Sequence, residues 1–254
     1  MTDSVLLGGD IGVNLASAVA ALAGAGLGRF AIIGGVAVTV RLGRVHRATA
    51  DVDTVVDATV PPDALEALLA ADAAEADPTG RPRVSISGTK LEIIHAQPVG
   101  SEDLDGISER ERLFLVAHAW ALDTATDATI GAIRDPSLTS TVPVSTPAAL
   151  IAMKLHAIQD RRPAGGVDKR GGDAWDIYRL LSDLDRDGAI CRAFEEAPDD
   201  VRASVRPALE RVMVTSANRT QGWLRWGDGA MATVSAAELR HVAAPLLDAL
   251  APPG

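Results

Sequence analysis

The chain has 254 residues, 47% apolar and 23% charged, a composition typical of a soluble globular protein with one large or two smaller domains. Its one cysteine, Cys191, excludes a disulfide-stapled scaffold and favours the cytoplasm as the compartment. The net charge of −10 excludes a general nucleic-acid binder, so any phosphate-binding surface has to be local.

The first apolar stretch, residues 11–40, is not expected to cross a membrane. Ala and Gly dominate it, Arg29 interrupts it, and glycines at 26 and 28 divide it. Asp3 and Asp10 stand where a signal peptide would carry basic residues, so no export signal is expected either.

In the N-terminal half, helical and extended apolar patterns alternate and are separated by glycine and proline breaks. In chain order they predict a helix over 13–25, a strand over 30–33, a helix over 36–42, a strand over 52–56, a helix over 61–76, strands over 83–87 and 91–96, a helix over 108–122, and strands over 129–134 and 140–144. The Ser-Gly-Thr sequence at 87–89 predicts a hairpin turn.

After Pro147 the pattern becomes helical throughout. The predicted helices cover 148–158, 174–184, 189–196, 201–214 and 236–250. The sequence therefore predicts two domains, an α/β domain over 1–144 and a helical domain over 145–254.

The most informative segment combines two glycines with two aspartates. Strand 30–33 ends at Gly34 and Gly35, where a helix begins, and the next strand carries Asp51 and Asp53. Glycines let a phosphate approach the backbone, and a helix N-terminus offers free N–H groups. Carboxylates at i and i+2 of a strand share a face, where Mg²⁺ would offset their repulsion. An Asp-x-Asp pair alone is more often a solvated face, but the preceding glycines favour a binding site.

Two further positions carry charge within apolar patterns. Glu92, the only charge among positions 91–94, is either an edge-strand residue facing water or a third carboxylate of the site. Lys154 interrupts an apolar helix in a chain whose other lysines are Lys90 and Lys169. It is either a snorkelling side chain or a compact ammonium kept for a triphosphate.

Asp173 and Asp176 follow Lys154 along the chain and share a helix face, because they are three residues apart. Asp173 has a second interpretation, as the N-cap of that helix.

Together these motifs resemble the nucleotidyltransferase superfamily that includes DNA polymerase β, through Gly-Gly, Arg47-x-Thr49-x-Asp51-x-Asp53 and a later strand carboxylate. The segment from Ser145 to Lys154, with Lys169, Asp173 and Asp176 after it, narrows the resemblance to AbiEii/AbiGii-type nucleotidyltransferases, many of which are toxins of toxin–antitoxin pairs. The resemblance covers about residues 28–185. It implies a polymerase β-like core with a mixed sheet, followed by a C-terminal helical bundle.

The resemblance also implies transfer of a nucleoside monophosphate from an NTP, with release of pyrophosphate and with Mg²⁺ or Mn²⁺ as cofactor. Its implied site residues are Gly34 and Gly35 at the phosphates, Arg47 and Thr49 beside the nucleotide, Asp51, Asp53 and Glu92 at the metal, Lys154 at the triphosphate, and Lys169, Asp173 and Asp176 on the helical side. Glu92 would in addition help to activate the acceptor hydroxyl.

The expected acceptor is a macromolecule, first of all a tRNA 3′ end, and the expected partners are the NTP and a cognate antitoxin. Arginines close to both motifs would contact RNA unless they are solvated surface: Arg41, Arg44, Arg47, Arg161, Arg162 and Arg170. The alternatives are transfer to a protein or small molecule, and a non-catalytic module that binds a nucleotide or partner. The presence of Asp51, Asp53 and Lys154 together favours an enzyme.

Overall fold

The structure, a computed structural model, describes residues 3–60, 68, 75–76, 82–100, 104–161, 169–225, 231 and 233–251. The chain divides into two compact units, Met1–Pro98 with Ala121–Thr146, and Val99–Trp120 with Pro147–Gly254. The domain boundary predicted at 144/145 lies two residues before the point where the chain last passes from the first unit to the second, between Thr146 and Pro147. Residues 99–120, which the sequence placed in the first domain, group with the second unit. Phe114 and Trp120 in this segment make ring contacts with His156 and Phe194 of that unit.

The first unit is built on one mixed sheet with the strand order β1-β7-β8-β2-β3-β6-β5-β4. Its elements are β1 (Asp3–Leu7), α1 (Gly9–Gly24), β2 (Phe30–Ile33), α2 (Gly34–Leu42), β3 (Asp51–Asp57), β4 (Glu75–Ala76), β5 (Pro82–Ile86), β6 (Thr89–Ala96), β7 (Thr126–Ala132) and β8 (Thr139–Val144). The pairs β1–β7, β2–β8 and β3–β6 are parallel, and the others are antiparallel. This arrangement confirms the predicted α/β class with a mixed sheet.

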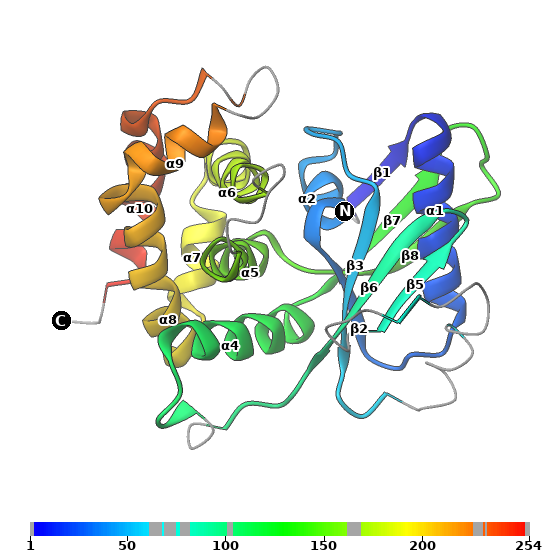
Figure 1. Ribbon diagram of the computed structural model, residues 1–254, viewed down its shortest axis with the longest axis horizontal. Helices are drawn as coiled ribbons and strands as arrows, with labels where there is room; N and C mark the ends of the chain where they lie inside the picture. The colour runs from blue at the N-terminus through cyan, green and yellow to red at the C-terminus, as the bar shows by residue number, and fades with distance from the viewer. Residues whose placement is uncertain are drawn as a thin grey trace. The chain divides into compact units, whose positions relative to one another are not determined.

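Two of the described helices cover this sheet (Figure 1). The longer one, α1, buries Leu15, Val19 and Leu22 against one face. The shorter one, α2, begins directly at the end of β2 and packs against β3 on the other face. The first turn of α2 is therefore held at the sheet by the strand that precedes it.

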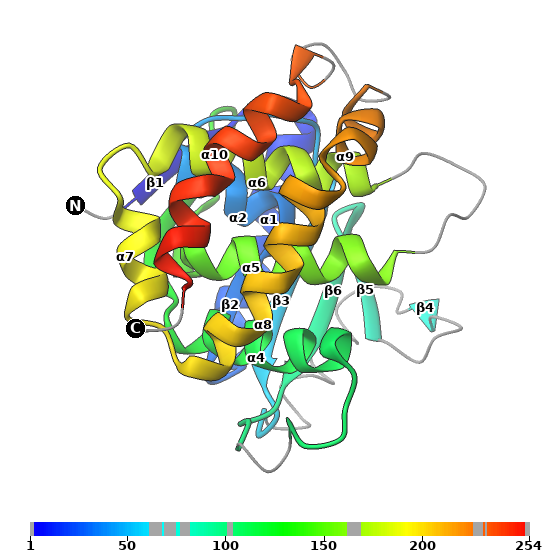
Figure 2. The ribbon, with the colours of Figure 1, turned by 90° about the vertical axis from the view of Figure 1, so that its left-hand side faces the viewer.

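The second unit is helical, as predicted. Its elements are α4 (Glu109–Asp123), which ends in the first unit, α5 (Pro147–Asp160), α6 (Arg170–Leu184), α7 (Ala189–Glu195), α8 (Asp199–Leu209), the π-helix η2 (Glu210–Thr215), α9 (Ala217–Leu224) and α10 (Ala236–Ala249). Figure 2 shows α10 alongside α8, and η2, which continues α8, also packs against α10. The buried side chains of this unit are mainly aliphatic, with Phe194 at 0% exposure.

The structure departs from the sequence expectations in several elements. β1 and α9 were not predicted, and the helix expected over 201–214 is divided at Glu210 into α8 and the π-helix. The helix expected over 61–76 lies largely outside the described residues; Leu68 is helical, but Glu75–Ala76 form β4. The predicted hairpin turn is confirmed, with Ser87 and Gly88 both at positive φ between antiparallel β5 and β6.

Among the described helices, none has both the length and the apolar character required to span a bilayer.

Candidate functional site

The turn from β2 into α2 depends on glycine. Ile33 is extended, and Gly34, the next residue, has φ +70°, a left-handed conformation that side chains with a Cβ rarely adopt. A Cβ at Gly34 would lie 1.9 Å from Oδ2 of Asp53. The absence of a side chain thus lets the first turn of α2 lie directly against the Asp53 carboxylate.

Gly35 is enclosed in the same way by the segment that precedes β3. A Cβ there would lie 2.7 Å from Oγ1 of Thr49 and 3.0 Å from Nη2 of Arg47. Arg47 also donates through Nη1 to the carbonyl of Ala48, at 3.1 Å. The structure therefore brings Gly35, Arg47 and Thr49 to one place.

The three predicted carboxylates lie on one face of the sheet. In the parallel pair β3–β6, Asp53 stands opposite Glu92, and Asp51 is two residues before Asp53 on the same strand. Paired residues of neighbouring strands project to the same side, with about 4.8 Å between the strands. The alternate residues, Val52 and Leu91, are fully buried on the other face.

Lys90 joins this face, and the sequence reasoning assigned no role to it. It pairs with Asp51 in the β3–β6 register and is half-buried. Its spacing of two residues from Glu92 was the available signal, because residues at i and i+2 of a strand share a face. Lys90 places a positive charge on the same face as Asp51, Asp53 and Glu92 and so reduces the repulsion among the three carboxylates.

We tested whether these residues fit a magnesium ion. Within the ranges that the structure describes, no group of three or more His, Cys, Asp and Glu side chains is arranged to hold a metal. Mg²⁺ at nucleotide sites usually takes one or two carboxylates, with waters and substrate phosphates as its other ligands. Asp53 provides such oxygen donors against the glycine turn, and Asp51 provides more on the same face of β3, so this donor set fits; Glu92 as a third ligand stays a prediction.

The second unit contains a buried ionic cluster around Lys154. The Nζ of Lys154 lies 2.9 Å from Oδ1 of Asp173 and 2.8 Å from Oδ2 of Asp176, and Nε of Arg161 lies 2.7 Å from Oδ2 of Asp173. The side chains of Lys154, Asp173 and Asp176 are only 9%, 3% and 0% exposed. Two cations thus oppose two anions, which offsets the cost of burying Lys154, Asp173 and Asp176.

This cluster decides two alternatives that the sequence left open. Lys154 does not snorkel, because its ammonium is buried between the two carboxylates. Asp173 is not an N-cap, because the cap position of α6 is Lys169 and the Asp173 carboxylate binds Lys154 and Arg161 instead. The side chain of Lys169 is exposed at the start of α6, and its predicted role stays a prediction.

Arg41, predicted as an RNA contact or a solvated residue, is neither. Its side chain is 6% exposed and donates to Asp3 Oδ2 at 2.7 Å and to the carbonyls of Ser145 at 2.8 Å, Thr126 at 3.2 Å and Val144. The guanidinium therefore ties α2 to β1 and to the adjoining ends of β7 and β8. No sequence signal separated this arginine from an exposed one.

Other arginines of the predicted RNA-binding set also have partners within the protein. Arg161 pairs with Asp173, and Arg170 lies 4.6 Å from the ring centroid of Trp223. Arg44 is exposed, and Arg162 lies outside the described residues.

Comparison with known families and structures adds the following findings. The family model for "Nucleotidyl transferase AbiEii toxin, Type IV TA system" matches residues 20–242. A search of curated proteins found no match.

Among solved structures, the chain is similar to an antigenic nucleotidyltransferase-like protein from Paracoccidioides brasiliensis, with 18% identity, 88% of this chain and 96% of that chain covered, and a TM-score of 0.48. It is also similar to ANT(2″)-Ia in complex with adenylyl-2″-tobramycin, with 18% identity, coverages of 79% and 97%, and a TM-score of 0.43. The chain is also similar to the solution structure of the antibiotic-resistance factor ANT(2″)-Ia, with 18% identity, 82% of this chain and 97% of that chain covered, and a TM-score of 0.44.

Proposed function

The chain belongs to the AbiEii nucleotidyltransferase family, and we propose that it is a magnesium-dependent toxin that transfers a nucleoside monophosphate from an NTP to the 3′ end of a tRNA. Membership confirms the family and the enzyme class, nucleotidyltransferase, that the motifs predicted. The metal, the tRNA acceptor and the toxic role are the proposal. The observation that carries it is the contact between the glycine turn of α2 and Asp53.

In this proposal the first turn of α2 binds the phosphates of the NTP. The N–H groups at a helix start have no partner within the helix, and the helix dipole is positive there. Gly34 and Gly35 place no side chain between these groups and a ligand. Thr49 and Arg47, which adjoin Gly35, then contact the nucleotide.

Asp51 and Asp53 would hold Mg²⁺, which neutralises charge on the triphosphate when it is bound. Glu92, opposite Asp53, would accept the proton of the acceptor hydroxyl. The acceptor oxygen then forms a bond to the α-phosphorus, and the bond from that phosphorus to the bridging oxygen breaks, so that pyrophosphate leaves. Lys90 would limit the charge repulsion on this face as the phosphates enter.

For the second unit we retain contact with the triphosphate as the proposed role of Lys154. Asp173 and Asp176 fix the position of its ammonium by two short ion pairs. They are therefore proposed as positioning residues, which act on the substrate through Lys154.

The decisive experiment is label transfer from each α-labelled NTP, with Mg²⁺, to total tRNA or to a cell lysate. Label on RNA that is lost with Asp53→Asn supports the proposal. The matched control is Asp57→Asn on the same strand, because Asp57 binds Thr59 at the far end of β3 and is expected to leave transfer unchanged. Label on protein or on a small molecule would show that this molecule, and not tRNA, is the acceptor. NTP binding with no transfer to any acceptor would favour a non-catalytic module.

The toxic role has its own test. Expression of the wild-type chain should arrest growth, and Asp53→Asn should relieve the arrest at equal protein level. Co-expression of a neighbouring gene product that restores growth would identify the antitoxin. Arrest that persists with Asp53→Asn would contradict toxicity by nucleotidyl transfer.

A further inference from the structure

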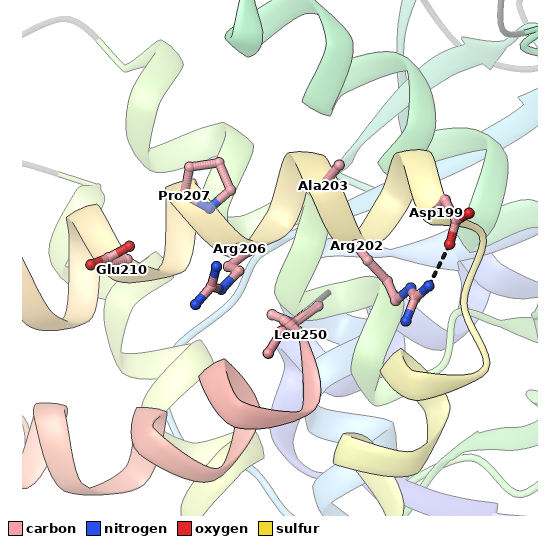
Figure 3. A pocket seen from close by; sticks show the side chains of 8 residues that line it. Asp199, Arg202, Ala203, Arg206, Pro207, Glu210 and Leu250 are labelled. Atoms are coloured by element: carbon pink, nitrogen blue, oxygen red, sulfur yellow. Dashed lines mark hydrogen bonds and ion pairs between the residues drawn. The ribbon is translucent and has the colours of Figure 1, made fainter. Parts of the chain in front are cut away.

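A groove of about 490 Å³ lies in the second unit, between α8 and the end of α10. Arg202 and Arg206 extend into it from α8, and Leu250 faces them from the end of α10 (Figure 3). Ala203 and Pro207 of α8 also line the groove and are apolar. We call these residues, with Asp199, Glu210 and Ala251, the α8 groove. None of them belongs to the nucleotidyl-transfer site proposed above.

The charges along the α8 groove follow a definite order. Asp199 and Glu210 stand at the two ends, and Arg202 and Arg206 lie between them. The two arginines are four residues apart on a helix, so their side chains leave the same face about 6 Å apart along the axis. A complementary ligand would place two negative groups at that spacing, with positive groups outside them.

Both arginines have donors to spare. Arg202 forms an ion pair with Asp199, whose side chain is 90% exposed, while its own Nε is buried and has no acceptor in the part of the chain that the structure describes. Within the described residues, no hydrogen bond or ion pair involves the side chain of Arg206. A buried donor without an acceptor costs free energy, so a carboxylate that engages Arg202 would relieve that cost.

The backbone beside these arginines is also irregular. Pro207 lies inside α8 and has no N–H, so it cannot donate the usual helical hydrogen bond to the carbonyl of Ala203. The helix changes to a π-helix three residues later, at Glu210. Such turns are frequent at functional sites, and this one begins at Glu210, which lines the groove.

We propose that the α8 groove binds a helical segment of a partner protein that carries two carboxylates one turn apart beside an aliphatic side chain. The carboxylates would bind Arg202 and Arg206, and the aliphatic side chain would pack on Ala203, Pro207 and Leu250. An RNA strand fits less well, since Asp199 and Glu210 repel phosphates and none of the described residues that line the groove is aromatic and able to stack on a base. The binding mode is that of an amphipathic helix in a groove.

The test uses a capped synthetic helix with two glutamates four residues apart, a leucine between them on the same face and a lysine beyond each glutamate. Titration of the full chain should give saturable binding. Arg206→Glu should weaken it about tenfold, the loss expected for one charge-assisted contact. A peptide with both glutamates replaced by lysine should bind the double variant Arg202→Glu/Arg206→Glu better than it binds the wild type.

Arg219→Glu is the matched control, because it makes the same charge change on an exposed arginine of α9, away from the groove. It should leave peptide binding unchanged, and Arg206→Glu should leave nucleotidyl transfer unchanged. The proposal is overturned if the wild type does not bind the peptide, if Arg219→Glu weakens binding as much as Arg206→Glu does, or if Arg206→Glu instead reduces the binding of tRNA. Transfer activity is measured separately, so its absence would count against the proposed function alone.

Discussion

The main chain of Gly34 lies against the carboxylate of Asp53, so closely that a Cβ on Gly34 would be 1.9 Å from Oδ2. Gly34→Ala must therefore displace Asp53 and also hold alanine at φ +70°, which costs about 1–2 kcal/mol. We expect kcat/KM for the NTP to fall about 100-fold, since displacements near 1 Å at a site have this effect. Steady-state kinetics of label transfer measures it.

Gly24→Ala is the control for this substitution. Gly24 ends α1, has an ordinary φ, and would meet no atom within 4 Å of a new Cβ. Kinetics should be unchanged and stability equal or slightly higher, because alanine favours the helix. Equal kinetics for Gly34→Ala and the wild type would contradict a role of the turn in binding phosphate.

Gly35→Ala should act on substrate binding through Thr49. The new Cβ would meet Thr49 Oγ1 at 2.7 Å, whereas the Arg47 contact at 3.0 Å involves the end of a flexible side chain. We expect the KM for the NTP to rise more than kcat falls. The clash should also lower the free energy of unfolding of Gly35→Ala, as measured with urea. Adding Thr49→Ala removes the clashing hydroxyl, so the double variant should be more stable than Gly35→Ala alone. Equal stability of the two would mean that the clash is relieved without movement of Thr49.

The candidate site in the first unit was inferred from signals that are local in sequence. A strand, two glycines and an Asp-x-Asp spacing each determine geometry over a few residues, and the β3–β6 register then places Glu92 beside Asp53. β1 was not predicted, and its pairing with β7 joins residues more than a hundred positions apart. Pairings at that separation leave no periodic signal in a single sequence.

The partners of buried charges were harder to predict than their positions. Lys154 and Asp176 were identified as candidates, but their ion pair depends on how α5 packs on α6. Arg41 and Arg44 look equivalent in sequence, yet one is buried among carbonyls and the other is exposed. Only tertiary packing separates such residues.

Lys154→Met should destabilise the protein by about 3–5 kcal/mol, the cost of leaving buried charges uncompensated. Both Asp173 and Asp176 would lose the ammonium at 2.9 and 2.8 Å. Urea unfolding measures the change. The triple variant Lys154→Met/Asp173→Asn/Asp176→Asn should regain part of this stability, because it removes the unpaired charges, but it should not regain activity. A Lys154→Met protein as stable as the wild type would contradict the buried pairs as a stabilising cluster.

Arg41→Ala should reduce the free energy of unfolding by about 3 kcal/mol, because it leaves buried carbonyls without donors. Arg41→Lys should recover less than half, since one ammonium cannot reach the set of acceptors that the planar guanidinium spans. Arg44→Ala, at an exposed side chain, should cost under about 1 kcal/mol. Urea unfolding separates the three. A tRNA-binding defect of Arg41→Lys at unchanged stability would restore the RNA-contact interpretation.

Cys191 should resist alkylation in the folded protein. Burial and the nearby Asp185 carboxylate, whose Oδ2 lies 2.9 Å from Sγ, raise the pKa of Cys191 to about 12. In the unfolded chain a thiol has a pKa of about 8.5, so raising the pH from there ionises Cys191 in the unfolded state first. The stability that this thiol contributes is therefore complete below about pH 8.5 and is lost as the pH rises towards 12.

Iodoacetamide at pH 8.5 should label the urea-unfolded protein and spare the native one. Asp185→Asn keeps an oxygen for the N–H groups of Ile190 and Cys191 but removes the charge, so it should speed native labelling. Native labelling as fast as that of the unfolded chain would show that Cys191 ionises normally in the fold.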